Sequence, residues 1–181
     1  LLATAGVHHH LVRECMRTKV GLVVESGEPR EVAHFALLFG YGAGAVNPYL
    51  TFETLADMVE QGAYIGITDY PTAERDYVKS VHKGVVKVMS KMGISTLQSY
   101  RGAQIFEAVG LNKDFIDHYF AWTPSRIGGV GVVEIEEECR RRHDFAYLEV
   151  KVAGQQGLKG GGQYQWRLDG EHHMWNPDSI A

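Results

Sequence analysis

The 181 residues suffice for one ordinary domain or two partial ones, and a content of 45% hydrophobic and 22% charged residues is typical of a folded chain rather than a disordered one. The net charge of −4 and the pI near 6.1 give no electrostatic footprint for nucleic acid or for an anionic membrane. Two cysteines, Cys15 and Cys139, are too few for a disulfide framework or a metal cluster, and no apolar run reaches the roughly 20 residues of a membrane helix, so we expect a cytoplasmic protein.

Three consecutive histidines, His8 to His10, stand near the start of the chain. Neighbouring side chains diverge in both helices and strands, so three in a row cannot point at one ion. We therefore expect this run to pack at a loop or a strand end, and we predict no metal site.

The apolar run from Val20 to Val24 predicts a strand buried on both faces. Glu25 and Ser26 then lie at its carboxyl end. Pro29 and Glu31 predict the start of a helix.

Three glycines at residues 40, 42 and 44 imitate a dinucleotide-binding loop. That fingerprint requires a strand before it and a helix after it, and here a helix comes first. We interpret the glycines as a helix end and a tight turn. Ala45 to Tyr49 predicts the next short strand, and a helix through Val59 follows, so two βα units stand in a row.

The segment from Gln61 to Thr72 is rich in turn residues and is the predicted domain connection. Thr72 or Asp76 is the predicted cap of a long amphipathic helix, which Gly93 ends.

A short strand, a polar turn and a second helix are predicted next, at residues 94–97, 98–101 and 103–109. Helix, strand, polar loop and helix is the local order of a parallel α/β protein, in which ligands gather at the carboxyl ends of strands. We therefore predict that the functional site lies at Ser95 to Arg101.

The remaining segments complete the secondary-structure prediction. Asn112 or Asp114 begins a helix that buries an aromatic face. The glycine-rich residues 125–131 form either a loop that approaches a ligand by its backbone or a flexible connector. Residues 132–146 form an exposed helix with Glu-Arg pairs. Residues 150–163 are a surface excursion, residues 163–174 a β-hairpin, and Asn176 starts a further helix.

Several long stretches together carry a family resemblance. SKMGISTLQSYRGAQIFEAVGL (residues 90–111) resembles the opening of the flavin-binding domain of the glutamate synthase large chain. HHHLVR (8–13) and VGLVVESGEPREVAHFALLFGYGAGAVNPYL (20–50) resemble the end of the central domain that precedes it. Residues 125–131 and GGQYQWRLDGEHHMWNP (161–177) also fit. The resemblance therefore covers nearly the whole chain.

The resemblance implies that the chain is a piece of a longer protein, and we expect the piece alone to be inactive. The implied fold is α/β: partial βα units of the central domain at residues 1–68, followed by the first part of a (β/α)8 flavin-binding barrel at residues 69–181.

The resemblance also implies an activity. The family makes two L-glutamate from L-glutamine and 2-oxoglutarate by reductive amination through 2-iminoglutarate, with FMN and a 3Fe-4S cluster as cofactors. The cluster ligands would lie outside this chain. The implied partners are the two substrates, the remaining domains of the same chain, and an electron-donor subunit or ferredoxin.

Within this chain the resemblance and the βα loop together point to Ser95, Thr96, Gln98, Ser99 and Arg101 as the border of the flavin or substrate cavity. Arg101 is suited to a phosphate or carboxylate.

Glu25 and Ser26 are weaker candidates for an ammonia tunnel or a domain interface. Two alternatives stay open. One is a flavin-barrel enzyme that lacks the glutaminase, and the other is a docking segment between domains that is not catalytic.

Overall fold

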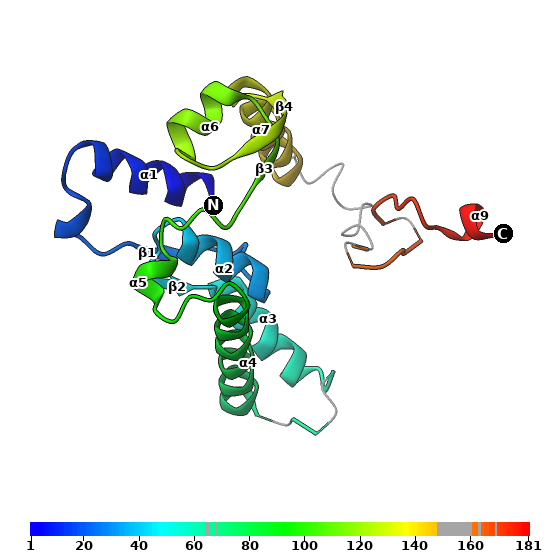
Figure 1. Cartoon of the computed structure of the whole chain (residues 1–181). Coiled ribbons are helices and arrows are strands. Elements are labelled where there is room, and N and C mark those ends of the chain that lie inside the picture. The colour runs from blue at the N-terminus through cyan, green and yellow to red at the C-terminus, as the bar shows by residue number, and fades with distance from the viewer. Residues whose placement is uncertain (64–65, 68, 148–160, 163, 169) are drawn as a thin grey trace. The chain divides into compact units, whose positions relative to one another are not determined.

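The computed structural model describes residues 1–63, 66–67, 69–147, 161–162, 164–168 and 170–181. These residues form two compact units, Leu1–Gly131 and Val132–Ala181 (Figure 1). The elements of the first unit are, in chain order, α1 (Leu2–Arg13), a 3-10 turn (Arg17–Lys19), β1 (Val23–Glu25), α2 (Val32–Gly40), β2 (Ala45–Asn47), α3 (Tyr49–Glu60), α4 (Tyr70–Lys91), α5 (Leu97–Tyr100), β3 (Ala108–Leu111), α6 (Lys113–Tyr119) and β4 (Ser125–Val130). The second unit contains α7 (Val132–Ala146) and α9 (Pro177–Ile180).

The strands form two separate parallel pairs. β1 pairs with β2, with Val23 opposite Ala45, and β3 pairs with β4, with Ala108 opposite Ser125. This confirms an α/β chain with parallel strands, but it does not confirm the start of a barrel. The predicted burial of the first strand on both faces was wrong: β1 begins at Val23, which is 75% exposed.

The main core of the first unit lies between α2 and α4. Phe35, Val81 and Val85 are buried there, and Val46 of β2 packs against them. The helices approach closely because residue 84 of α4 is glycine: a Cβ at this position would lie 2.3 Å from Val32 Cγ2. A second group of buried apolar side chains lies on α6, against which α1 packs.

The signals that end and begin helices were mostly read correctly. The turn after α2 contains Gly42 at a φ of +110°, and Gly93 follows α4 at +71°, both as expected of glycines at helix ends. Asn112 caps α6 by accepting from Phe115 N at 2.8 Å, which confirms one of the two predicted caps. The cap of α4 is Asp69, not Thr72 or Asp76: the Asp69 carboxylate accepts from Thr72 N at 3.0 Å.

The predictions between residues 94 and 131 were wrong in three places. Residues 94–97 do not form a strand, since Thr96 caps the short helix α5. Residues 103–109 are not helical, since Ala108–Leu111 is β3. Residues 125–131, predicted as a loop, contain β4.

The pairing of β3 with β4 explains two of these errors. Val109 and Leu111 find partners in β4, and a Cβ at Gly129 would lie 2.2 Å from Gly110 O. The absence of a side chain at Gly129 therefore permits the two backbones to lie side by side.

In the second unit, α7 confirms the predicted exposed helix, and Arg141 pairs with Glu137 and Arg142 with Glu138 on it. The predicted surface excursion at residues 150–163 lies outside the described residues, apart from Gly161 and Gly162. The predicted hairpin was wrong, because the described residues between 163 and 174 include no strand. Asn176 caps α9 as expected, accepting from Ser179 N at 2.9 Å.

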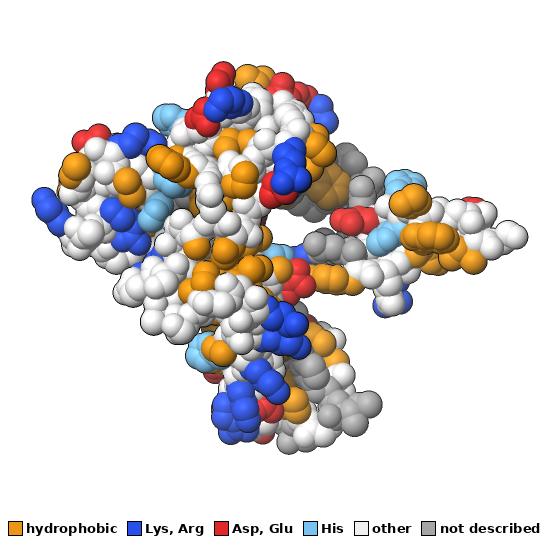
Figure 2. All heavy atoms as spheres, viewed as in Figure 1, with side chains coloured by type: hydrophobic (Ala, Val, Ile, Leu, Met, Phe, Trp, Pro, Cys, Tyr) orange, Lys and Arg blue, Asp and Glu red, His pale blue; other side chains and the backbone are white. Residues whose placement is uncertain are grey.

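Many apolar side chains stay at the surface of the described residues (Figure 2). Among the helices that the structure describes, none is both long enough and apolar enough to cross a membrane.

The predicted domain boundary at residues 68 and 69 stays a prediction. α3 and α4, on either side of it, pack against each other.

Candidate functional site

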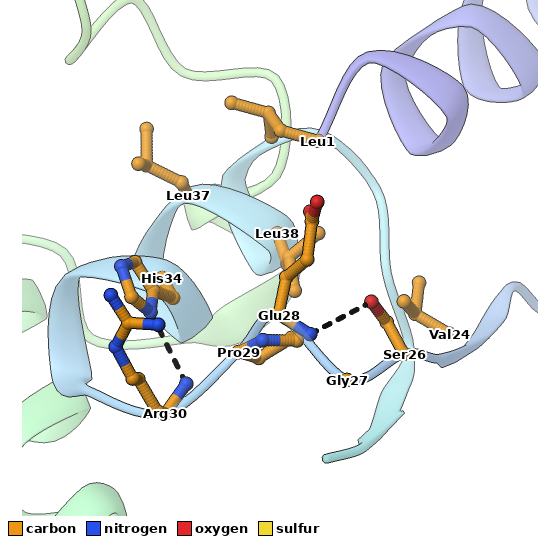
Figure 3. Close-up of a pocket in the computed structure, with 10 residues that line it drawn as sticks. All are labelled: Leu1, Val24, Ser26, Gly27, Glu28, Pro29, Arg30, His34, Leu37 and Leu38. Atoms are coloured by element: carbon orange, nitrogen blue, oxygen red, sulfur yellow. Dashed lines mark hydrogen bonds between the residues drawn. The ribbon is translucent and has the colours of Figure 1, made fainter. Parts of the chain in front are cut away.

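A pocket of about 450 Å³ lies where β1 ends and the chain turns into α2. Figure 3 shows the loop from Ser26 to Arg30 and, beside it, His34, Leu37 and Leu38 of α2, with Leu1, which precedes α1, as a further lining residue. Parallel α/β proteins bind ligands at the carboxyl ends of their strands, and this pocket has that position.

Backbone contacts hold the first half of the loop. Ser26 N donates to Asn47 O at 3.1 Å, which continues the β1–β2 pairing, and Glu28 N donates to Ser26 Oγ at 3.2 Å. Gly27 sits against α3, where an added Cβ would lie 3.3 Å from Leu50 Cβ. Ser26 therefore shapes the turn as well as lining the pocket.

Side chains from two other helices hold the second half. Thr51 of α3 donates to Pro29 O at 2.8 Å, and Tyr77 of α4 donates to Arg30 O at 3.0 Å. Arg30 N donates to His34 Nδ1 at 3.2 Å, while His34 Nε2 lies 3.3 Å from Glu31 Oε1. The pocket wall is thus preorganised by contacts from α2, α3 and α4.

The lining residues suit binding rather than bond making. The polar lining consists of the hydroxyl of Ser26, the carboxylate of Glu28, the guanidinium of Arg30 and the imidazole of His34, and the apolar lining includes Leu37 and Leu38. Among the lining residues described, no nucleophile is hydrogen-bonded to a base, as covalent catalysis requires. The arrangement can orient a polar molecule or a chain segment.

Replacing Thr51 by valine should loosen this loop. The Pro29 carbonyl would lose its donor, which costs about 1 kcal/mol and makes the Glu28 and Arg30 amides exchange about fivefold faster. Thr54→Val is the matched control, because Thr54 donates to Leu50 O within its own helix. Equal acceleration by both variants, in hydrogen exchange on the full-length protein that contains this chain, would contradict the assignment.

Sequence reasoning found part of this site. Ser26 was singled out and lines the pocket, whereas Glu25 is the last residue of β1 and is not a lining residue. Glu28, Arg30 and His34 were missed. The strand followed by Gly27 and Pro29 could have indicated them, because it marks a βα loop.

The five residues predicted to border a flavin or substrate cavity lie in and around α5. The turn closes largely on itself: Thr96 Oγ1 donates to Ser99 Oγ at 2.9 Å, and Arg101 Nη1 donates to Gln98 Oε1 at 3.4 Å. Ser95 borders a separate shallow cleft of about 350 Å³ beside the end of α4. The structure thus brings four of the five together, and their contact with a flavin stays a prediction.

The residues present do not fit the two implied cofactors by themselves. A 3Fe-4S cluster needs a cysteine thiolate on each of its three irons, and the chain has two cysteines, in different units. No group of three or more His, Cys, Asp or Glu residues in the described part of the chain can hold a metal ion. In the α5 turn, Thr96 and Ser99 are hydrogen-bonded to each other. These groups therefore do not form a phosphate-binding loop for a flavin.

The histidine run lies in α1, so the predicted loop or strand end was wrong. His8 faces inward, and its Nδ1 accepts from Arg17 Nε at 2.9 Å. Arg17 also donates to Val20 O and Gly42 O, and thereby ties α1 to the turn after α2. Burial, followed by the positive charges of His9, Arg17 and Arg101, lowers the pKa of His8 to about 4.

Acid should loosen α1. Between pH 6.5 and about 4 the unfolded chain binds more protons at His8 than the folded chain does, so the stability of this contact is complete above pH 6.5 and falls as pH drops. The loss is on the order of 1 kcal/mol, because His8 is half-exposed and solvent screens its charge.

The measurement is hydrogen exchange of residues 8–17 at pH 7 and 4.5, corrected for intrinsic rates. His8→Asn keeps an acceptor for Arg17 but does not titrate, so it should reduce the acid sensitivity by at least about half. An unchanged acid sensitivity in this variant would refute the role of His8.

A known family model matches more than half of the chain. Residues 1–112 match the family model described as the glutamate synthase central domain. The match continues past residue 69, where the flavin-binding part was predicted to begin, and includes the α5 turn.

Relatives match along the whole chain. The chain is 53% identical to the NADPH glutamate synthase large chain of Bacillus subtilis (strain 168), 43% to the NADH glutamate synthase of Schizosaccharomyces pombe, and 40% to ferredoxin-dependent glutamate synthase 2 of Synechocystis. These alignments cover 99%, 100% and 98% of this chain, but 12%, 9% and 12% of the relatives. The chain therefore spans about a tenth of the length of the curated relatives it matches.

Proposed function

Because this chain belongs to the glutamate synthase family, we propose that it works as a segment of a glutamate synthase large chain. The whole enzyme would make two L-glutamate from L-glutamine and 2-oxoglutarate, by reductive amination through 2-iminoglutarate. The observation that carries the proposal is the identity of 40% or more over at least 98% of the chain with large chains from a bacterium, a fungus and a cyanobacterium.

In the whole enzyme, the proposed role of this segment is to support the neighbouring domains and to line part of the substrate cavity. The loop from Ser26 to Arg30 is held by three helices, so it can present a fixed surface to the rest of the enzyme. The proposed cofactors are FMN, which supplies the reducing chemistry when bound, and a 3Fe-4S cluster whose ligands lie elsewhere in the enzyme. An electron-donor subunit or ferredoxin is the proposed electron source.

The test is anaerobic absorption spectroscopy of the full-length protein that contains this chain. The protein is first reduced and then given glutamine and 2-oxoglutarate. We expect the oxidised flavin bands to return only when both substrates are present.

Two other outcomes would contradict the proposal. Return of the bands with ammonia and 2-oxoglutarate, but not with glutamine, would indicate a flavin enzyme without a coupled glutaminase. A protein without flavin would favour the alternative in which this segment docks domains together and is not catalytic.

A further inference from the structure

A second cleft, of about 380 Å³, lies within the first unit, away from the loop that ends β1. α1 forms one wall with His8, His9 and Arg13. The turn after α2, residues 102–106 and the connection from α6 to β4 form the remaining walls, with Tyr41, Phe106 and Trp122 as their aromatic side chains. A volume of this size fits a small organic molecule.

The α1 wall contains polar groups with unused bonding capacity. His9 Nε2 is buried and has no hydrogen-bond partner among the described residues. Arg13 uses one nitrogen, Nη1, to donate to His118 O at 3.1 Å. Most buried polar side-chain atoms in proteins have a partner, so an unpaired ring nitrogen in a cleft indicates an acceptor or donor supplied by a ligand.

Positive charge surrounds this wall and is not balanced. Arg13, Arg17 and Arg101 form no ion pair with a carboxylate in the described part of the chain. Arg101 Nε is also buried and has no hydrogen-bond partner in the part of the chain that the structure describes. Asp117 is the acidic residue among the lining residues, and Lys113 already binds it at 2.6 Å.

The opposite walls are apolar and held in place. Tyr41 stacks on Phe106 with ring centroids 5.7 Å apart, and its hydroxyl lies 2.7 Å from Thr123 Oγ1. Gln104 Nε2 donates to Trp122 O at 2.7 Å, which holds Trp122 at a φ of +70°, an uncommon value for a residue other than glycine. Trp122 is 85% exposed, although its backbone is fixed beside the cleft.

We propose that this cleft binds a small organic carboxylate, whose carboxyl group accepts hydrogen bonds from Arg13 and His9 and whose apolar body packs on Tyr41 and Phe106. A carboxylate supplies the acceptors that the α1 wall lacks, and a planar guanidinium matches its geometry. A carboxylate also supplies one negative charge near Arg13, Arg17 and Arg101, which form no ion pair among the described residues. The proposal does not depend on the proposed enzyme activity, because it concerns binding to residues of this chain alone.

The probe is benzoate, with benzamide as an uncharged molecule of the same shape. The experiment is hydrogen exchange with mass spectrometry on the full-length protein that contains this chain, read on the peptides that cover residues 8–17 and 118–123. We expect benzoate to slow exchange in both peptides in a saturable way, and benzamide to have at least a tenfold weaker effect, because a hydrogen bond to a charged group is worth about 1.5–3 kcal/mol.

Two variants and one control locate the site. Arg13→Gln should weaken benzoate binding about tenfold or more, and since Arg13 is exposed the variant should fold normally. His9→Phe should also weaken binding. Its exchange pattern without benzoate shows whether α1 is still in place. Arg75→Gln, an exposed arginine on α4 that does not line the cleft, should leave binding unchanged.

Three results would overturn the proposal. These are equal protection by benzoate and benzamide, equal protection by sodium chloride at the same ionic strength, and unchanged benzoate binding in Arg13→Gln. None of them depends on flavin or on turnover, so failure here is distinguishable from failure of the proposed enzyme activity.

Discussion

Tyr100→Ala is expected to destabilise the packing of α5 on α2 by about 3–5 kcal/mol. Tyr100 is the fully buried large side chain among the described residues, and its ring lies edge-on to Phe106. The hydroxyl donates to Ala36 O at 3.1 Å, and burial raises the pKa of this phenol, so it stays protonated and remains a donor. The substitution leaves a cavity and removes the contact by which α5 is anchored.

Hydrogen exchange of the α2 and α5 amides in the full-length protein measures the effect. A loss of 3 kcal/mol or more corresponds to exchange faster by about a hundredfold or more. Tyr100→Phe is the control that keeps the ring and removes the hydroxyl, and it should cost about 1 kcal/mol. If both variants exchange alike, the ring does not anchor α5.

Gly84→Ala is expected to destabilise the packing of α4 on α2 by about 1–3 kcal/mol, although alanine is the better helix former. The new Cβ would lie 2.3 Å from Val32 Cγ2, 2.8 Å from Cγ1 and 3.1 Å from Cβ. Rotating the valine side chain does not clear both methyl groups, so the helices must move apart. The core formed by Phe35, Val81 and Val85 lies at this contact and would open.

Adding Val32→Ala should rescue Gly84→Ala in part, because it removes the two methyl groups that collide. The double variant should therefore be more stable than the sum of the two single variants predicts, by more than about 0.5 kcal/mol. Hydrogen exchange of the α2 and α4 amides reports it. Additive effects would show that the collision is relieved by movement elsewhere.

Local signals carried the correct predictions of helix starts and ends. Proline and glutamate before α2, glycine at positive φ after α2 and α4, and asparagine before α6 act through backbone geometry within a few residues. Such signals need no tertiary partner, which is why the positions of these helices were predicted from sequence.

The segments from Ile94 to Val130 depended on partners far along the chain. Residues 94–97 and 103–109 are short, and their state is decided by what they pair with. Within residues 94–97, Thr96 caps the helix α5. The end of residues 103–109 belongs to β3, which pairs in parallel with β4. β4 itself contains Gly128 and Gly129, which oppose a strand prediction, yet the missing side chain at Gly129 is what permits the close approach to Gly110.

The candidate sites also combine features that local sequence predicts with contacts between residues far apart in the chain. Ser26 was identified because it follows an apolar run, a feature that the sequence contains. The shape of the pocket depends on Thr51 and Tyr77, which are 22 and 47 residues away from the carbonyls that they bind. The carboxylate cleft joins residues 8–13 to residues 102–123, so no local pattern indicated it.

By itself, the sequence determined the α/β class, several helix ends and, through long near-continuous matching runs, the family. The tertiary structure alone decided which short apolar segments became strands, which way the histidines of α1 face, and which distant side chains meet in a cleft. The physical reason is that capping and turn formation depend on a few neighbouring residues, whereas strand pairing, burial of a polar group and the formation of a cavity depend on residues that only folding brings together.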